Sequence, residues 1–235
     1  MKTVILAGGK GTRISEETLN LPKPMISIGG KPILWHIINY YSKFNFKDFI
    51  ICAGYKLMSI KKYFINYKNV NVVDTGLNSQ TGIRIKKIRN LIGNDDNFFM
   101  SYGDGLSNVD LKELTKIFLN NNCIGILTTV RPPARFGKIY IKGNRVTKFE
   151  EKNQLDEGWI NGGYFIFNKK IFKYINNDKT NFETYSLKKL AKENNLMLKK
   201  HFEFWQCMDT LREKIILNNM YKKNNAPWLI KKELF

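Results

Sequence analysis

The sequence is poor in cysteine and histidine, the residues that most often build disulfide frameworks, zinc sites and nucleophilic catalytic sets. Its 235 residues include three cysteines and two histidines. Cys52, Cys123 and Cys207 are widely spaced and odd in number, so we expect packing residues in a reducing cytoplasm, with no disulfide or zinc framework. His36 and His201 belong to no Ser-His-Asp or Cys-His arrangement, which argues against a covalent enzyme intermediate.

Long apolar runs are also absent. No stretch approaches the length of a membrane-spanning helix, and residues 3–7 are too few for the core of a signal peptide. We therefore expect no membrane partner. A hydrophobic content of 43% with 13% aromatic residues still predicts a globular chain with a substantial core.

Acidic residues are scarce: the sequence has 20 Asp and Glu residues against 39 Lys and Arg residues, which gives a net charge of +19. Nucleic acid is the first partner to consider for such a chain. The cations are mostly lysines spread over the whole sequence in short pairs, and neither an RNA-binding motif nor a DNA-reading helix stands out. We expect no nucleic-acid partner; the positive field suits phosphate-rich small substrates, which it would steer toward the protein.

A glycine-rich turn with two basic residues follows the first apolar run, residues 1–6. Residues 7–13 read Ala-Gly-Gly-Lys-Gly-Thr-Arg, and glycines let backbone N–H groups approach oxygens closely. Arg13 can fork onto two phosphate oxygens, and Lys10 adds a point charge. The pattern predicts a phosphate-binding loop, and the plain alternative is a tight turn that binds nothing.

Two better-known phosphate loops do not fit this sequence. A dinucleotide fingerprint requires a third glycine, and Ile14 stands in that place. A Walker loop requires Ser or Thr after its lysine, whereas Pro32 follows Lys31 in the nearest match. The turn therefore belongs to another kind of nucleotide or phosphate site.

Strand-like and helix-like runs alternate in the first part of the chain. The expected strands are residues 2–6, 49–52, 70–73, 98–102 and 124–130, and the expected helices are residues 32–44, 57–64, 83–91 and 111–120. Such alternation predicts an α/β, Rossmann-like fold whose mostly parallel central sheet is flanked by helices. Ligands of these sheets bind beyond the carboxyl ends of the strands, where residues 8–13 and 103–105 both fall. Two remote loops are thus expected to face one crevice.

The pattern changes after about residue 132. Residues 138–141, 146–150 and 159–167 are expected to be strands joined by tight polar turns, and helices are expected at residues 182–193 and 210–221. No linker, repeat or low-complexity tract separates the two parts. We predict a single domain over residues 1–235, with one lobe over residues 1–131 and a smaller β-rich lobe over residues 132–235.

The phosphate loop carries a resemblance to a known family. Residues 6–13 followed by Pro22-Lys23-Pro24 resemble the signature of the sugar nucleotidyltransferases, whose fold is GT-A-like. Ser-Glu-Glu-Thr at residues 15–18 and Gly-Gly-Lys-Pro-Ile-Leu-Trp-His-Ile at residues 29–37 are similar to the glucose-1-phosphate cytidylyltransferases within that family. The likeness continues at residues 73–76, 81–82, 102–105, 132–137, 151–152, 159–163, 204–206, 208–212 and 226–228.

The resemblance implies roles for individual residues. Lys23 and Arg13 would be catalytic, and Asp104 and Asp209 would hold Mg²⁺, which suits one or two carboxylates together with phosphates and water. The implied nucleotide-binding residues are Leu6, Ala7, Gly8, Gly9, Lys10, Gly11, Thr12, Thr81, Gly82 and Gly103. The implied acceptor-binding residues are Lys152, Asn161 and Gly162. The first lobe would then bind CTP, and the second a phosphorylated small molecule.

Each of these roles has a plainer alternative. Asp104 could be a turn former in its Gly-Asp-Gly sequence, and Asp209 could cap the following helix. Lys23 could be an exposed loop lysine, although two flanking prolines hold it on a stiff segment. Arg135 could be an active-site cation or an ordinary surface arginine.

The expected reaction is direct in-line attack by an acceptor phosphate on the α-phosphorus of CTP, with pyrophosphate leaving. A phosphate monoester near neutral pH is mostly dianionic, since its second pKa is about 6, so no general base is required. Catalysis would consist of positioning and electrostatic stabilisation by Lys23, Arg13 and the metal.

Departures from the family pattern fall mostly on the acceptor side. Asn153 stands where Glu-Lys-Pro is usual, Tyr185 and Ser186 replace a Glu-Pro pair, and Ile83 replaces a glycine. A segment usual between residues 64 and 72 is shortened, which leaves a homo-oligomer possible but unspecified. These changes favour an acceptor other than glucose 1-phosphate, such as L-glutamine phosphate on a capsule precursor route; glucose 1-phosphate and a catalytically idle regulatory protein are the alternatives.

Overall fold

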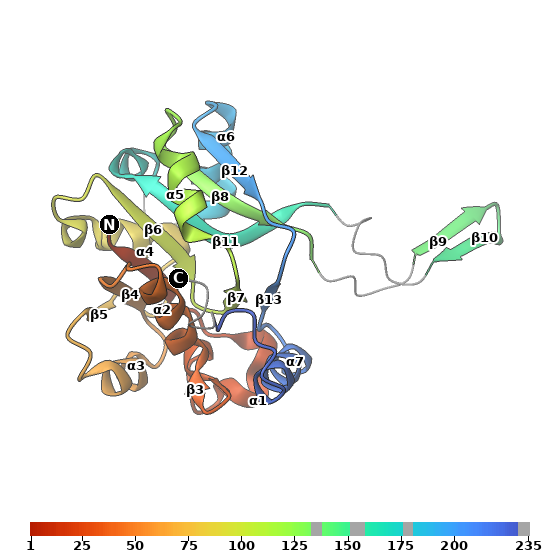
Figure 1. The fold of residues 1–235 in the computed structure, drawn as a ribbon, viewed down its shortest axis with the longest axis horizontal. Helices are drawn as coiled ribbons and strands as arrows, with labels where there is room; N and C mark the ends of the chain where they lie inside the picture. The colour runs from red at the N-terminus through yellow and green to blue at the C-terminus, as the bar shows by residue number, and fades with distance from the viewer. Residues whose placement is uncertain (133–137, 151–157, 176–180, 230–235) are drawn as a thin grey trace.

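A mixed sheet of seven strands is built around β1 (Thr3–Ala7), all five residues of which are buried. The computed structural model describes residues 1–132, 138–150, 158–175 and 181–229 (Figure 1). The strand order is β12-β8-β11-β6-β1-β4-β5, and β11 alone among these runs antiparallel to its neighbours. The mostly parallel sheet that the sequence predicts is therefore confirmed.

The sheet strands are β1, β4 (Phe49–Ala53), β5 (Val70–Asp74), β6 (Asn97–Tyr102), β8 (Gly125–Val130), β11 (Ile160–Asn168) and β12 (Leu196–Lys200). Three small ribbons pair β2 (Ser27–Ile28) with β3 (Lys31–Pro32), β7 (Gly105–Ser107) with β13 (Trp205–Cys207), and β9 (Lys138–Lys142) with β10 (Arg145–Glu150). The strands expected in the first half of the sequence all form, with ends shifted by a residue or so.

The α-helices are α1 (Ser15–Thr18), α2 (Ile33–Lys43), α3 (Leu57–Phe64), α4 (Thr81–Lys87), α5 (Leu111–Leu119), α6 (Lys188–Lys192) and α7 (Leu211–Lys222). Short 3₁₀ turns are η1 (Thr12–Ile14), η2 (Lys23–Met25), η3 (Arg89–Ile92) and η5 (Lys169–Tyr174), and η6 (Phe182–Leu187) is a π-helical turn. The helix expected over residues 182–193 is thus divided between η6 and α6. In the described part of the chain, no helix is both long and apolar enough to cross a membrane.

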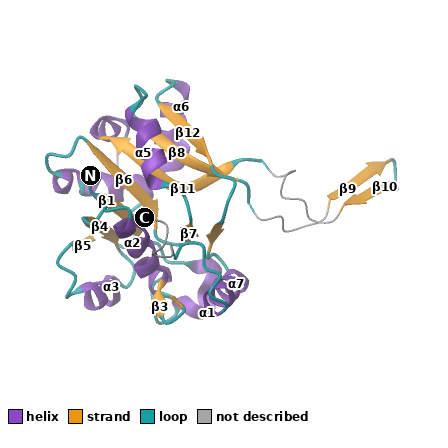
Figure 2. Cartoon of the chain, viewed as in Figure 1, coloured by secondary structure: helices purple, strands orange, loops and turns teal. Residues whose placement is uncertain are grey.

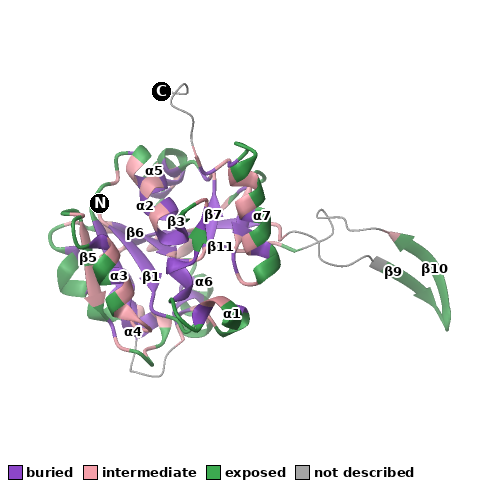
Figure 3. Ribbon diagram, turned by 90° about the horizontal axis from the view of Figure 1, so that it is seen from below, coloured by how far each residue is buried: buried purple, intermediate pink, exposed green. Residues whose placement is uncertain are grey.

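Helices cover both faces of the sheet (Figure 2). Successive buried residues of β1 point to opposite faces, so Ile5 joins a core with α2, α5 and α7, while Val4 joins a second core with α4, η6 and α6. Burial on both sides explains why the parallel strands appear in the sequence as continuous apolar runs. Figure 3 shows the buried interior strands and, in contrast, the exposed β9–β10 ribbon that stands away from the sheet.

The second half of the chain contributes to the same sheet. β11 pairs with both β6 and β8, and β12 extends the sheet beyond β8. β9 and β10 pair with each other and with no other described strand. The division into two lobes stays a prediction. Both halves of the chain contribute strands to one continuous sheet.

Candidate active site

The glycine-rich loop leaves the carboxyl end of β1 and turns back at Gly11, whose φ of +67° lies in the left-handed region that favours glycine. A Cβ on Gly11 would lie 2.9 Å from the Cβ atom of Lys23, so the loop packs directly on the segment that carries this lysine. The Thr18 hydroxyl donates a hydrogen bond to the Gly11 carbonyl at 3.3 Å. The loop and the lysine segment therefore form one local unit.

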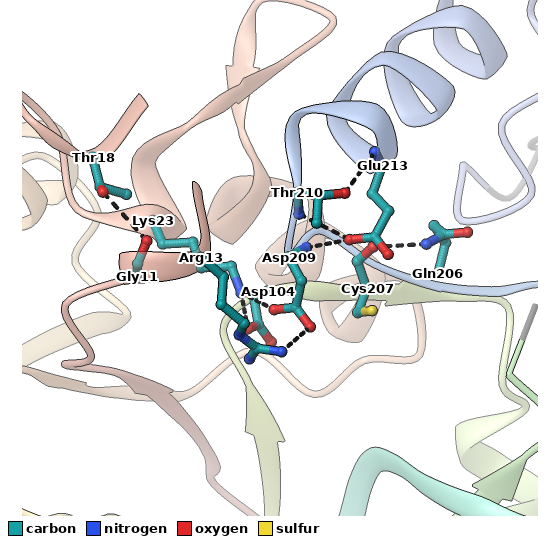
Figure 4. A network of polar contacts seen from close by, with 10 residues as sticks. All are labelled: Gly11, Arg13, Thr18, Lys23, Asp104, Gln206, Cys207, Asp209, Thr210 and Glu213. Atoms are coloured by element: carbon teal, nitrogen blue, oxygen red, sulfur yellow. Dashed lines mark hydrogen bonds and ion pairs between the residues drawn. The ribbon is translucent and has the colours of Figure 1, made fainter. Parts of the chain in front are cut away.

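Lys23 is 7% exposed and lies between two prolines at the start of η2. Its ammonium contacts the carboxylate of Asp104 at 2.6 Å and that of Asp209 at 2.5 Å (Figure 4). The Arg13 guanidinium contacts the second oxygen of Asp209 at 2.6 Å, and its side chain is 70% exposed. Four of the residues implied by the resemblance thus meet at one point, from positions as far apart as 13 and 209.

The β7–β13 ribbon brings the two carboxylates together. β7 begins directly after Asp104, its first residue Gly105 pairs with Cys207, and the Met208 amide donates to the Asp104 carbonyl at 2.8 Å. Asp209 follows at the end of this ribbon. The pairing of two short strands distant in sequence therefore fixes the separation of the two acids.

A capping box holds Asp209 at the amino end of α7. The Thr210 hydroxyl accepts a hydrogen bond from the Glu213 amide, and the Glu213 carboxylate accepts from the Thr210 amide at 2.9 Å. The same carboxylate accepts from the Asp209 amide at 2.6 Å. The cap expected as the plain alternative for Asp209 is supplied by Thr210, which leaves the Asp209 side chain directed toward Lys23.

The charges around Lys23 stabilise its protonated form. Burial lowers the pKa of the Lys23 ammonium, but the neighbouring carboxylates of Asp104 and Asp209 outweigh that effect and raise the pKa above its ordinary value. Lys23 is therefore a permanent cation at neutral pH. A buried cation beside two acids gives a site of alternating charge that can exchange partners when an anionic ligand enters.

The donor set fits a divalent cation. Two carboxylates from separate elements converge on one positive group, the ammonium of Lys23, so both can face a single ion. Mg²⁺ takes oxygen ligands and is usually held by one or two carboxylates with phosphates and water. Glu213, which also lies near Asp209, is engaged in capping α7.

Two cavities meet at this charged centre. A cavity of about 570 Å³ is lined by the glycine loop, by Lys23, and by Gln80, Thr81 and Arg84 from the region of α4. A cavity of about 680 Å³ is lined by Asn161, Gly162 and Trp205, among others. We call these the loop cavity and the β11 cavity. Arg13, Tyr102 and Asp104 line both, so a molecule in each cavity would meet its neighbour beside the Lys23–Asp104–Asp209 cluster.

The predicted site residues divide clearly between these cavities. The loop cavity is lined by Leu6, Ala7, Gly8, Gly9, Gly11, Thr12, Thr81 and Gly103. Gly82 is buried within α4 and Lys10 is exposed on the loop, and neither lines this cavity. Asn161 and Gly162 line the β11 cavity, while Lys152 and Arg135 lie outside the described residues.

Arg84 is a site residue that the sequence analysis does not assign. Arg84 is 4% exposed, and its guanidinium donates to the Gly8 carbonyl at 3.0 Å, to the Ala53 carbonyl at 3.2 Å and to the Thr75 hydroxyl at 2.7 Å. It thereby ties the glycine loop to the ends of β4 and β5. A Cβ on Gly8 would lie 2.0 Å from this guanidinium, so any larger residue there would displace the arginine from its hydrogen bonds.

Tyr102 and Glu183 are two further site residues to which the sequence analysis gives no role. Tyr102 directly precedes the Gly-Asp-Gly turn at the end of β6 and forms part of the wall between the cavities. Its hydroxyl donates to Glu183 at 2.8 Å, and the other oxygen of Glu183 accepts from the Thr81 hydroxyl at 2.9 Å. Tyr102 stands next to the Gly-Asp-Gly turn, which is a signal in the sequence, whereas Glu183 has no comparable signal.

The fold and the charged centre define an α/β protein with a buried lysine and two carboxylates at the carboxyl edge of a mostly parallel sheet. The family model described as Nucleotidyl transferase matches residues 2–221. The chain belongs to the nucleotidyl transferase family and is a nucleotidyltransferase.

Relatives of known name support this membership. The chain is 43% identical to the glucose-1-phosphate cytidylyltransferase of Salmonella typhimurium, over 97% of this chain and 98% of that protein. It is 35% identical to the probable glucose-1-phosphate cytidylyltransferase of Bacillus subtilis, over 98% of this chain and all of that one. The Salmonella alignment spans 253 positions, more than the 235 residues of this chain, so that relative has residues for which this chain has no counterpart.

The fold is also shared with solved structures. A UDP-glucose pyrophosphorylase complexed with UDP-glucose matches with a TM-score of 0.74 and 20% identity, over 95% of this chain and 98% of that one. At this level of identity the match carries the fold alone. It agrees with the mostly parallel seven-stranded sheet described above.

Proposed function

We propose that this protein transfers a cytidylyl group from CTP to the phosphate of a sugar 1-phosphate, with glucose 1-phosphate as the first acceptor, and releases pyrophosphate. The observation that carries this proposal is the meeting of two cavities at the Lys23–Asp104–Asp209 cluster. Full-length similarity to glucose-1-phosphate cytidylyltransferases supports the choice of CTP and of glucose 1-phosphate.

The loop cavity suits the nucleotide. Its glycine loop supplies backbone N–H groups, and the buried Arg84 beneath it adds a positive charge near the bound phosphates. The β11 cavity suits the acceptor, with the amide of Asn161 and the indole of Trp205 in its lining. In this arrangement the acceptor phosphate approaches the α-phosphorus from the side opposite to the departing pyrophosphate.

The reaction needs charge stabilisation more than proton transfer. An oxygen of the acceptor phosphate forms a bond to the α-phosphorus while the bond from that phosphorus to the β-phosphate oxygen breaks, and pyrophosphate carries away the electron pair. We assign Lys23 to the α-phosphate, because it is buried in the lining of the loop cavity and its ammonium contacts Asp104, which lines both cavities. We assign Arg13 to the departing pyrophosphate, because its side chain is largely exposed and its guanidinium can fork onto two phosphate oxygens.

Mg²⁺ is the cofactor that we assign to Asp104 and Asp209. Bound there, it would offset the negative charge that gathers on the phosphate oxygens. The same two carboxylates keep Lys23 in place before substrate enters, since the lysine contacts both of them. The protein's own contribution is thus to hold one cation, Lys23, ready at the reacting phosphorus.

The departures that favoured a different acceptor do not reach the β11 cavity in the described part of the chain. Tyr185 is 38% exposed and lines neither cavity, and Ile83 is buried within α4. Asn153 lies outside the described residues. The two relatives named above are both named for glucose 1-phosphate, so this compound replaces L-glutamine phosphate as the leading acceptor.

A product assay tests the proposal. The protein is incubated with Mg²⁺, each of the four nucleoside triphosphates in turn, and either glucose 1-phosphate, another sugar 1-phosphate or L-glutamine phosphate, and products are identified by phosphorus NMR. We expect CDP-glucose and pyrophosphate only with CTP and glucose 1-phosphate, and none with the Lys23→Ala variant. A product formed with another nucleotide, or with L-glutamine phosphate in preference to glucose 1-phosphate, would contradict the proposed specificity.

A further inference from the structure

The wall between the two cavities contains an unbroken chain of side-chain hydrogen bonds. The Thr81 hydroxyl donates to Glu183 at 2.9 Å, the Tyr102 hydroxyl donates to Glu183 at 2.8 Å, and the Asn161 amide donates to the Tyr102 hydroxyl at 3.1 Å. Thr81 lines the loop cavity, Asn161 lines the β11 cavity, and Tyr102 lines both. These residues come from α4, η6, β6 and β11.

The chemistry of Glu183 fixes the direction of every bond in this chain. An ionised carboxylate only accepts hydrogen bonds, so the Tyr102 hydroxyl must donate to it. Burial, assisted by the charge of Glu183, raises the pKa of Tyr102 above its ordinary value, so the phenol keeps its proton. Because the Tyr102 proton is donated to Glu183, the phenol oxygen can only accept a hydrogen bond from Asn161. The side-chain nitrogen of Asn161 must therefore face Tyr102.

The other side of Asn161 is also committed. Its side-chain oxygen accepts from the Gly163 amide at 2.8 Å, where the register between β11 and β8 shifts between Asn161 and Phe165. Irregularities of this kind redirect a side chain out of the ordinary alternation of a strand. The amide of Asn161 therefore has one orientation, and its second N–H, which has no partner among the described residues, can donate to a ligand of the β11 cavity.

The two oxygens of Glu183 belong to one planar group and serve opposite sides of the wall. A ligand that contacts Gln80 and Thr81 in the loop cavity would shift the Glu183 oxygen that accepts the hydrogen bond from Thr81. Any rotation of the Glu183 carboxylate also moves its other oxygen, which accepts the hydrogen bond from Tyr102. The position of Tyr102 in turn sets the amide of Asn161.

We propose that Tyr102 and Glu183 are positioning residues that couple the two cavities, so that a nucleotide bound in the loop cavity raises the affinity of the β11 cavity for the acceptor. This inference rests on the proposed function for the identity of the two ligands. Because coupling between binding sites is reciprocal, the acceptor raises the affinity for the nucleotide by the same factor.

Binding measurements on three variants test the coupling. Calorimetry gives the affinity for glucose 1-phosphate with and without a saturating CTP analogue whose α,β-bridging oxygen is replaced by a methylene, which prevents turnover. In the unaltered protein we expect the analogue to tighten acceptor binding about tenfold, within the range usual for coupled sites. In Tyr102→Phe, which removes only the hydroxyl, the factor should fall below about twofold.

Tyr40→Phe is the matched control. The Tyr40 hydroxyl is also buried and donates to the Val109 carbonyl at 2.7 Å, but it belongs to no part of the chain of bonds. This control should lose thermal stability and keep the full coupling factor. Thr81→Val, which cuts the chain at its other end, should lose the factor as Tyr102→Phe does, and it gives a second measurement if the latter variant folds poorly.

The outcomes are distinct. A coupling factor that survives in folded Tyr102→Phe or Thr81→Val protein overturns the inference and leaves the proposed function standing. A factor near one in the unaltered protein does the same. If the unaltered protein does not bind glucose 1-phosphate under any condition, the acceptor named in the proposed function is wrong and the inference falls with it.

Discussion

Replacing Lys23 by methionine removes one positive charge from between two carboxylates while keeping most of the side-chain volume. Asp104 and Asp209 would then face each other without the cation that both contact, at 2.6 and 2.5 Å. Removing one partner of a fully buried ion pair costs about 3–5 kcal/mol. The Asp104 side chain is 30% exposed, and Asp209 keeps its contact with Arg13, so water and that arginine reduce the loss to about 2 kcal/mol.

The effect on turnover should be larger than the effect on stability. A preorganised charge-stabilising group of an active site is worth about 10²–10³ in turnover when it is removed. Lys23 is buried in the lining of the loop cavity and is held there by two contacts, so we expect a loss at the upper end of that range, about a thousandfold. KM for CTP should change far less, because many other groups line the loop cavity.

The assays are pyrophosphate release for turnover and thermal denaturation for stability. A stability loss of about 2 kcal/mol corresponds to about 4–8 °C in Tm for a chain of this size. Because the freed carboxylates of Lys23→Met attract a divalent ion, Mg²⁺ should raise its Tm more than that of the unaltered protein. Lys214→Met, which breaks an ion pair with Glu17 at 2.5 Å outside the cluster, is the control. Near-normal turnover in Lys23→Met would refute the assignment of this lysine to the reaction.

Three other changes test the packing around the site. Arg84→Met removes the hydrogen bonds to the Gly8 and Ala53 carbonyls and to the Thr75 hydroxyl, although the Gly8 carbonyl keeps the one from the Tyr55 amide, so urea denaturation should show a loss of about 3 kcal/mol. KM for CTP should rise more than kcat falls; a neutral effect on both would contradict the bracing role. Thr210→Ala removes the capping box of α7 and should lower the free energy of unfolding by about 1 kcal/mol in the same measurement. An unchanged free energy of unfolding would show that the capping box does not stabilise the protein. Burial lowers the pKa values of His36 and His201 below their ordinary 6.5. As the pH falls, these histidines therefore bind protons in the unfolded chain before they do so in the folded protein. The urea midpoint should fall as the pH drops below about 6.5, and less steeply in His36→Gln.

Much of the sheet could be predicted from sequence because its interior strands are buried on both faces. β1 and β4, for example, are apolar over nearly their whole length, and such runs are typical of parallel strands covered by helices. β12 was not predicted, since this edge strand carries two lysines among its five residues and lacks that signal. The place of β11 between β6 and β8 also has no local signature, because it depends on pairing between remote segments.

The charged centre could be predicted and the wall between the cavities could not. Lys23, Asp104 and Asp209 stand in motifs whose residue types suit phosphate and metal chemistry, and the structure brings them together. Glu183 is an unremarkable acid in sequence and lies 81 positions from Tyr102. Its significance comes from a π-helical turn that replaces the expected regular helix and from the side chains that converge on it.

The antiparallel strand β11 has a consequence for how the protein is made. On the ribosome, β6 and β8 are both complete by residue 130, yet they have no common partner until β11 (Ile160–Asn168) emerges and inserts between them. β6 can already pair with β1, but the edges of β6 and β8 that face β11 stay unpaired for roughly 2–8 s at a synthesis rate of 5–20 residues per second. A chain released before residue 160 cannot close its sheet, and such fragments should associate with chaperones or aggregate.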